Sequence, residues 1–181
     1  MSGARAGYLG LGSNVGDRRA NLQAALDGLL ARGVAVTGSS AVYDTDPVGE
    51  VLDQAPFLNA CLAIETALEP LELLELCKAL ERDLGRAAGC VRHGPRLIDI
   101  DVLLLGSLEL TTERLALPHA QVLTRRFVLI PLLELDFELR TPAGERLADS
   151  LAALDFSEGV RRAGPKLELV AASAPRTPAG A

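Results

Sequence analysis

Two aspartates interrupt an apolar run in the segment GPRLIDIDVLLLG, residues 94–106. Alternate residues of a strand point to the same face, so the side chains of Asp99 and Asp101 project together, with Cα atoms roughly 6 to 7 Å apart. The isoleucines and the valine around them then point the other way, into the core. Neighbouring carboxylates repel unless a cation lies between them, and Mg²⁺ usually takes one or two carboxylates plus substrate phosphates. Alone, the pair is more typical of an edge strand with a solvated polar face. Together with the preceding GPR and the nearby arginines, it indicates a magnesium site for phosphate chemistry.

Arginines gather near this pair, whereas lysine occurs only at Lys78 and Lys166. The planar guanidinium presents a fork of donors that suits phosphate oxygens. Arginines on a solvated surface would be the ordinary alternative. The favoured interpretation is that Arg92 and Arg96, just upstream of the aspartates, hold the rest of a polyphosphate. The arginines that gather locally are Arg82, Arg86, Arg92 and Arg96, with Arg125 and Arg126 as a second pair.

The usual glycine-rich phosphate loops are absent from the sequence. No segment matches GxxxxGK[ST], and Gly10, Gly12 and Gly16 miss the GxGxxG spacing by one residue. Phosphate binding is therefore expected to depend on arginine and metal.

The segment FLN provides a second candidate feature. Phe57 and Asn59 lie two residues apart, so a strand places them on one face. An aromatic ring beside an amide suits a flat heterocycle with donor and acceptor edges. Taken by themselves, these residues favour the ordinary interpretation, with Phe57 in the core and Asn59 as a strand-end cap.

Composition limits the class of protein. The chain has 181 residues and 49% hydrophobic content, which predicts one domain with a sizeable core. The net charge of −6 disfavours nucleic-acid binding by bulk charge. The short apolar runs disfavour a membrane span, and the N-terminal segment lacks the pattern of a signal peptide, so a cytoplasmic location is expected. Three widely spaced cysteines argue against a disulfide framework and a structural zinc.

Strand and helix patterns alternate along the chain. Asp17 is the expected N-cap of the first helix, while Pro70 and Gly85 are expected to open and close the second. This order predicts an α+β sandwich, a largely antiparallel sheet with helices packed on it. The expected strands are 7–12, 34–45, 57–66 and the one bearing the aspartates, which a hairpin through Gly106 and Ser107 joins to 108–110; one or two short helices are expected within 116–135.

The expected domain organisation is a single domain over residues 1–163. Residues 164–181 end in AASAPRTPAGA, a composition typical of a disordered tail.

Six segments together carry a family resemblance, from about Tyr8 to Leu135. They are YLGLGSNVGDR, YDTDPVG, FLNACLAIET, LERDLGR, RHGPRLIDIDVLLLG and LALPHAQVLTRRFVLIPLLEL. In order and spacing they resemble the 6-hydroxymethyl-7,8-dihydropterin pyrophosphokinases of folate biosynthesis. The resemblance implies the same α+β sandwich, of the ferredoxin-like kind. It also implies a reaction that moves pyrophosphate from ATP to the hydroxymethyl oxygen of the pterin and releases AMP.

The resemblance further implies roles for particular residues. Asp99 and Asp101 would bind two Mg²⁺ ions that bridge the ATP phosphates, and with Arg86 and Arg96 they would form the catalytic set. The turn of Gly12, Ser13 and Asn14 would border the pocket. The implied pterin-binding residues are Thr45, Asp46, Val48, Phe57, Asn59, His93 and Phe127. The implied nucleotide-binding residues are Lys78, Glu81, Arg92, Ile100, Val102, Arg114, His119 and Arg125.

Some positions depart from the family pattern. Asp46, Ala88, His93 and Ala120 stand where the family usually has Pro, Arg, Trp and Tyr, which bears on closure over the substrates. The expected partners are ATP and the pterin, with no nucleic acid and no membrane, in a monomer or weak homodimer. Two other functions stay open, a magnesium-dependent transferase with another acceptor and a non-catalytic nucleotide-binding module.

Overall fold

The computed structural model describes residues 3–46, 55–85, 96–157 and 159–169. The elements in chain order are β1 (Arg5–Ser13), α1 (Arg18–Ala31), β2 (Ala35–Ser39), β3 (Val42–Thr45), β4 (Phe57–Thr66), α2 (Pro70–Asp83), β5 (Asp99–Leu105), β6 (Leu110–Thr111), β7 (Ala116–Leu117), α3 (Arg126–Leu135), α4 (Leu147–Ala153) and β8 (Val160–Gly164).

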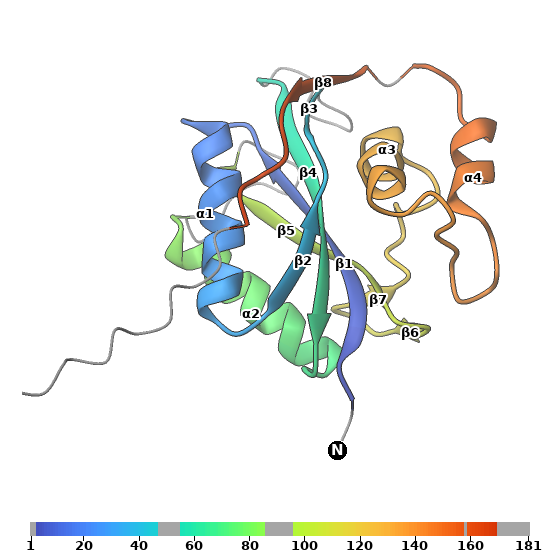
Figure 1. The fold of residues 1–181 in the computed structure, drawn as a ribbon, viewed down its shortest axis with the longest axis horizontal. Helices are drawn as coiled ribbons and strands as arrows, with labels where there is room; N and C mark the ends of the chain where they lie inside the picture. The colour runs from blue at the N-terminus through green and yellow to red at the C-terminus, as the bar shows by residue number, and fades with distance from the viewer. Residues whose placement is uncertain (1–2, 47–54, 86–95, 158, 170–181) are drawn as a thin grey trace, which may run out of the picture.

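The main sheet is antiparallel at every described pairing. Its strand order is β5-β1-β4-β3-β8, and β2 pairs with β4 further along that strand. Helices α1 and α2 cover one face, while α3 lies on the other with α4 beside it (Figure 1). This architecture confirms the predicted α+β fold with a largely antiparallel sheet.

The first helices form where their sequence signals stand. The Asp17 carboxylate accepts a hydrogen bond from the Ala20 N–H at 3.0 Å, which caps α1 as expected. Pro70 occupies the first turn of α2, and after that helix Gly85 takes a φ of +102°, a left-handed conformation that favours glycine. The predicted starts of both helices and the predicted stop of α2 are therefore confirmed.

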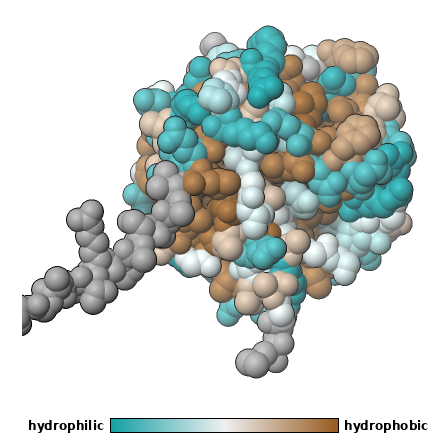
Figure 2. Space-filling model, in the orientation of Figure 1, coloured by the Kyte–Doolittle hydropathy of each residue, from teal (hydrophilic) through white to brown (hydrophobic). Residues whose placement is uncertain are grey.

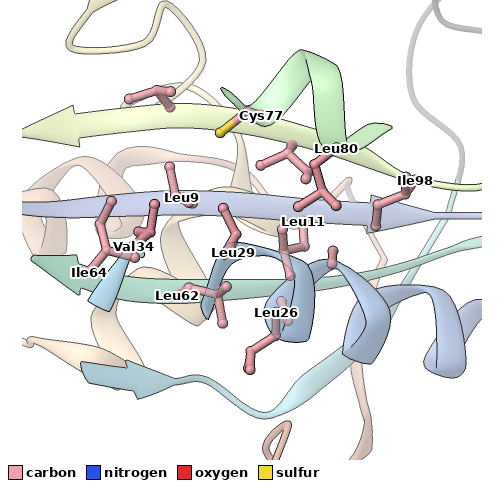
Figure 3. Packing of buried hydrophobic residues seen from close by; sticks show 14 of the residues in the cluster. Leu9, Leu11, Leu26, Leu29, Val34, Leu62, Ile64, Cys77, Leu80 and Ile98 are labelled. Atoms are coloured by element: carbon pink, nitrogen blue, oxygen red, sulfur yellow. The ribbon is translucent and has the colours of Figure 1, made fainter. Parts of the chain in front are cut away.

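The larger core fills the space between the sheet and these two helices. Leu26 and Leu29 of α1 and Leu80 of α2 face Leu9 and Leu11 of β1 (Figure 3). All five side chains are buried, at 2% exposure or less. Burial of each such leucine contributes on the order of 1.5–3 kcal/mol, so this layer fixes how β1 and β5 lie.

The segment 34–45 differs from the single strand that was expected. It forms β2 and β3, separated at Ser40, whose hydroxyl accepts the Cys61 N–H at 2.9 Å in place of a backbone carbonyl. The Ser40 N–H donates to the Cys61 carbonyl at 2.9 Å. The irregularity is local because both halves still pair with β4.

The predicted turn through Gly106 and Ser107 forms, with the Leu108 N–H donating to the Leu105 carbonyl at 3.1 Å, but the predicted pairing of 108–110 with β5 is wrong. After this turn the chain leaves the sheet. Leu110–Thr111 pairs instead with Ala116–Leu117, as β6 and β7. The His119 N–H donates to the Leu103 carbonyl at 2.9 Å, so a later segment borders β5 where the hairpin was expected.

The predicted start of a disordered tail at Gly164 also needs correction. Gly164 ends β8, and Leu167 is only 4% exposed within the larger core. Gln23 of α1 donates to the Glu168 carbonyl and accepts from its N–H, both at 2.9 Å. Residues 164–169 therefore pack on α1, and the rest of the predicted tail lies outside the described residues.

The surface of the described part mixes residue types. Figure 2 shows hydrophilic areas spread between smaller hydrophobic ones on the face of Figure 1. In the described residues, no helix combines the length and the apolar character that crossing a bilayer would require. Among the described residues, the exposed large hydrophobic side chains are Val15, Leu71, Phe137, Phe156 and Leu169.

Candidate active site

Asp99 and Asp101 lie at the start of β5, on the sheet face opposite α1 and α2. Both are half-buried, while Ile98, Ile100 and Val102 are 0–1% exposed in the core. The predicted division of the strand into a carboxylate face and an apolar face is confirmed. It is a consequence of the two-residue period of a strand.

Glycines stand opposite both carboxylates on the neighbouring strand. In the register of β1 with β5, Gly12 pairs with Asp99 and Gly10 with Asp101. Opposite residues of an antiparallel pair share a face, so no β1 side chain projects beside either carboxylate. The space over these glycines is bordered instead by side chains of other residues, by Leu103 at Gly10 and by Asn59 and Phe57 at Gly12.

Cations lie next to Asp99. Arg96 Nη1 is 2.6 Å from Asp99 Oδ2, and Lys78 Nζ is 3.9 Å from Asp99 Oδ1. Asn14 holds the backbone of Arg96 through two hydrogen bonds. The Asn14 side-chain Oδ1 accepts the Arg96 backbone N–H, and the Asn14 backbone N–H donates to the Arg96 carbonyl. Arg96 is thus brought to the carboxylates by a turn some eighty residues earlier in the chain.

The electrostatics of Asp101 disfavour its charged form. Burial raises the pKa of Asp101, and the neighbouring charge of Asp99 raises it further, while Lys78 and His119 act in the opposite direction. A cation bound between the carboxylates would relieve both unfavourable effects.

His119 presents a defined tautomer near Asp101. Its Nδ1 accepts a hydrogen bond from the Gln121 N–H at 3.2 Å. In the neutral imidazole the proton then sits on Nε2, which is a donor. A donor there suits a phosphate oxygen.

The donor set fits Mg²⁺ that arrives with phosphates. Within the described residues, no group of three or more His, Cys, Asp or Glu side chains could enclose an ion. Two carboxylates on one face do match the few protein ligands that Mg²⁺ takes when phosphates and water complete its shell. The cation is therefore expected to bind together with a nucleotide.

A second group of residues lies on β3 and β4, on the other side of Gly12 from the two carboxylates. Asn59 pairs with Gly12, and Phe57 pairs with Thr45, so these residues share the carboxylate face. Asn59 Nδ2 donates to Thr45 Oγ1 at 2.6 Å, which fixes the amide. A Cβ atom at Gly12 would lie 3.0 Å from Asn59 Oδ1, so a side chain there would crowd the amide oxygen. Phe57 is half-buried.

The start of α3 faces the same side of the sheet. Arg125 is the N-cap residue of α3, and Phe127 follows in its first turn, partly buried against the second core cluster. This helix packs on β3 and β4. Phe57 thus belongs to the sheet and Phe127 to the helix that packs on its carboxylate side.

Other predicted site residues have partners or surroundings of their own. Asp46 pairs with Arg161 of β8 at 2.7 Å, and this ion pair had no signal in the sequence because 115 residues separate its members. Arg114 pairs with Glu75 on the exposed side of α2. The side chains of Ile100 and Val102 lie in the core, so a ligand could meet only their backbone. Val48, Arg86, Arg92 and His93 lie outside the described residues.

The fold and this site define a class of protein. An α+β sandwich with paired carboxylates, an arginine and a separate aromatic and amide group suits a metal-dependent transferase of phosphoryl-type groups. A family model described as 7,8-dihydro-6-hydroxymethylpterin-pyrophosphokinase matches residues 8–137. The chain belongs to this family and is an ATP-dependent pyrophosphokinase.

Two relatives that match this chain over most of their own length carry the corresponding name. The 2-amino-4-hydroxy-6-hydroxymethyldihydropteridine pyrophosphokinase of Methylorubrum extorquens is 48% identical over 156 residues, which cover 86% of this chain and 96% of the relative. The enzyme of that name from Bacillus subtilis is 44% identical, with 85% and 87% covered. An Arabidopsis thaliana folate synthesis bifunctional protein is 43% identical over 70% of this chain, but over only 23% of its own length.

Solved structures share the fold. A structure titled as HPPK-DHPS in complex with substrates gives a TM-score of 0.67 at 12% identity, over 83% of this chain and 43% of that chain. The Plasmodium falciparum HPPK-DHPS variant A437G with SDX-DHP gives 0.64 at 15% identity, over 84% and 46%. The present chain therefore spans less than half the length of these proteins, and the likeness supports the fold.

Proposed function

We propose that this protein transfers pyrophosphate from ATP to 6-hydroxymethyl-7,8-dihydropterin and releases AMP, in folate biosynthesis. The observation that carries the proposal is the shared face of β5 and β4. Asp99 and Asp101 lie beside Arg96 at one part of it, and the Phe57–Asn59–Thr45 group lies across Gly12 at the other. A phosphate-handling region thus adjoins a region suited to a flat heterocycle.

The chemistry is a displacement at the β-phosphorus. The hydroxymethyl oxygen of the pterin forms a bond to that phosphorus, the bond from the phosphorus to the α,β-bridging oxygen breaks, and AMP leaves with that oxygen. The hydroxyl proton is released, and no residue is assigned as its base. We propose an in-line geometry for attack and departure.

Two Mg²⁺ ions, held by Asp99 and Asp101, would neutralise phosphate charge and polarise the reacting phosphorus when bound. Arg96 is already placed within 2.6 Å of Asp99, and it would turn to phosphate oxygens when a cation takes that carboxylate. His119 offers a donor from Nε2, and Arg125 offers another cation at the start of α3. Arg86 and Arg92 are proposed as further phosphate contacts and Ile100, Val102 and Arg114 as nucleotide neighbours, while Lys78 and Glu81 contact the Ile100 backbone from α2.

The pterin would lie between Phe57 and Phe127. Asn59 would read an edge of the ring, since its amide is held by Thr45 and its Oδ1 is directed toward Gly12. Asp46, Val48 and His93 are proposed to complete this part of the site.

One assay tests the proposal. AMP formation from ATP should require both Mg²⁺ and 6-hydroxymethyl-7,8-dihydropterin, with one AMP formed for each pyrophosphorylated pterin. Activity with a different acceptor would assign the site to another transferase reaction. Binding of ATP without any turnover would make this chain a nucleotide-binding module.

A further inference from the structure

Within the described residues, the strand that carries the two aspartates has a strand partner on one side only. In the described residues, β5 pairs only with β1 and ends the strand order of the sheet. Edge strands leave a row of backbone donors and acceptors without a strand partner. Something else must therefore hold the outer side of β5 where precise placement of carboxylates is needed.

Two side chains of α2 take the place of a strand at Ile100. Glu81 Oε1 accepts the Ile100 N–H at 2.7 Å, and Lys78 Nζ donates to the Ile100 carbonyl at 3.2 Å. Lys78 also donates to Glu81 Oε1 at 2.7 Å. One lysine–glutamate pair at i and i+3 thus supplies the acceptor and the donor that a neighbouring strand would supply.

The burial of this pair shows that it is built into the fold. The Glu81 side chain is 1% exposed, and Lys78 is 29% exposed. A buried carboxylate is costly unless it is paired and hydrogen-bonded, and here it is both. Leu80, which lies between Lys78 and Glu81 in sequence, packs in the larger core with the leucines of β1. This packing fixes where α2 lies relative to β5.

The position of the two hydrogen bonds is what links the pair to the site. The Ile100 N–H belongs to the peptide that joins Asp99 to Ile100, and the Ile100 carbonyl belongs to the peptide that joins Ile100 to Asp101. Fixing both peptides fixes the directions in which the two carboxylates leave the strand. Groups that orient metal ligands in this way commonly change metal affinity 10–100-fold when they are removed.

We propose that Lys78 and Glu81 are positioning residues, which clamp the peptides on both sides of Ile100 and thereby hold Asp99 and Asp101 ready to bind metal with the nucleotide. This assignment rests on the proposed function of the carboxylates. It differs from a direct nucleotide contact for Glu81, because a buried carboxylate bonded to the strand is poorly suited to meet a polyphosphate.

The first test replaces Glu81 in the full chain. Glu81→Leu removes the acceptor, so hydrogen exchange of the Ile100 amide, followed by NMR, should accelerate on the order of tenfold or more. Binding of Mn²⁺ in the presence of a non-hydrolysable ATP analogue, followed by electron paramagnetic resonance, should weaken by about 10-fold or more. Glu81→Gln keeps an acceptor oxygen and should retain slow exchange at Ile100.

Asp83→Asn is the matched control on the same helix. Asp83 is exposed and pairs with Arg32 of α1, away from β5, so this variant should leave both readouts unchanged. Equal acceleration in Asp83→Asn and Glu81→Leu would overturn the proposal, because it would report general loosening of α2. Unchanged Mn²⁺ affinity in a folded Glu81→Leu protein would overturn it as well.

A second variant keeps the test decisive if Glu81→Leu does not fold. Lys78→Met removes the donor to the Ile100 carbonyl and leaves Glu81 in place. Mn²⁺ affinity with the nucleotide analogue should fall, while affinity for the analogue without metal should change little. An equal fall in both affinities would make Lys78 a direct nucleotide contact and overturn its positioning role. Failure of the proposed function would appear separately, as wild-type protein that forms no AMP.

Discussion

At the scale of single residues, the surroundings of Asp101 disfavour the ionised form of its carboxyl group. Burial and Asp99 both raise its pKa. A carboxyl group whose pKa is raised on folding is ionised at a cost to the folded state once the pH exceeds that pKa. The ligand-free protein therefore carries a local destabilisation that a metal or a neutral side chain would remove.

We expect Asp101→Asn to abolish pyrophosphoryl transfer while raising the free energy of unfolding of the ligand-free protein at pH 7 by roughly 0.5–2 kcal/mol. Urea denaturation without metal or nucleotide measures this. The difference from wild type should shrink as the pH is lowered through the raised pKa of Asp101, because the wild-type carboxyl then becomes neutral too. Retained activity across an Mg²⁺ titration would contradict the metal assignment.

Phe57 is the residue that tests the heterocycle part of the site. Its ring is half-buried on the face shared with Asn59. We expect Phe57→Ala to weaken pterin binding by about 1–3 kcal/mol, the range for stacking of a base on an aromatic ring, with little change for ATP. Calorimetry with an ATP analogue present measures both ligands.

Phe137→Ala is a suitable control for this substitution, since Phe137 is 64% exposed and lies after α3. It should leave pterin affinity unchanged. Equal losses of pterin and ATP binding in Phe57→Ala would indicate that Phe57 supports the core.

At the scale of elements, α3 is tied to the sheet by one carboxylate. Both oxygens of Glu134 accept the Ala41 N–H, at 3.0 and 3.1 Å, and Oε2 accepts the Tyr43 hydroxyl at 2.9 Å. Burial raises the pKa of Tyr43 to about 12, with further contributions from its hydrogen bond to Glu134 and from the negative charge of that residue. The contact lies where β2 gives way to β3.

We expect Glu134→Ala to lower the free energy of unfolding by about 1–3 kcal/mol, because the Ala41 N–H and the Tyr43 hydroxyl lose their acceptor. The pKa of Tyr43 should fall but stay above its ordinary value, since burial is the largest cause of its shift. Ultraviolet titration of tyrosinate measures this, and Tyr43→Phe assigns the signal between the two tyrosines of the chain. An unchanged pKa would show that Glu134 does not act on Tyr43.

At the scale of the whole molecule, the segment after β8 closes the core over α1. Leu167 is buried, its N–H donates to Ser39 Oγ at 3.3 Å, and Glu168 is bonded to Gln23. We expect truncation after Gly164 to lower the free energy of unfolding by about 1.5–3 kcal/mol, the contribution of one buried leucine. Truncation after Leu169 should change it by less than about 0.5 kcal/mol. Thermal denaturation of both truncated proteins decides this, and equal stability would show that the packing of Leu167 contributes nothing.

Residues with strong local signals were predictable from the sequence. The period of two in residues 98–102 determines that the aspartates share a face, because side-chain direction in a strand depends on backbone geometry alone. The Asp17 cap and Pro70 start are local in the same sense. The grouping of the pterin-pyrophosphokinase motifs likewise depends on the order of residues, and the family match bears it out.

Tertiary structure decided the features that depend on distant partners. The pairing expected after β5 fails because a segment near His119 borders the outer side of β5 and Leu110–Thr111 pairs with Ala116–Leu117, neither of which local spacing can reveal. Residues 164–169 are ordered because α1 and the core accept Leu167 and Glu168 across more than a hundred residues of sequence. The clamp on Ile100 is also of this kind: the family resemblance implied only that Lys78 and Glu81 lie near the nucleotide, and the fold places them along the outer edge of β5. Contacts of this sort form only when the whole core has fixed where each element lies.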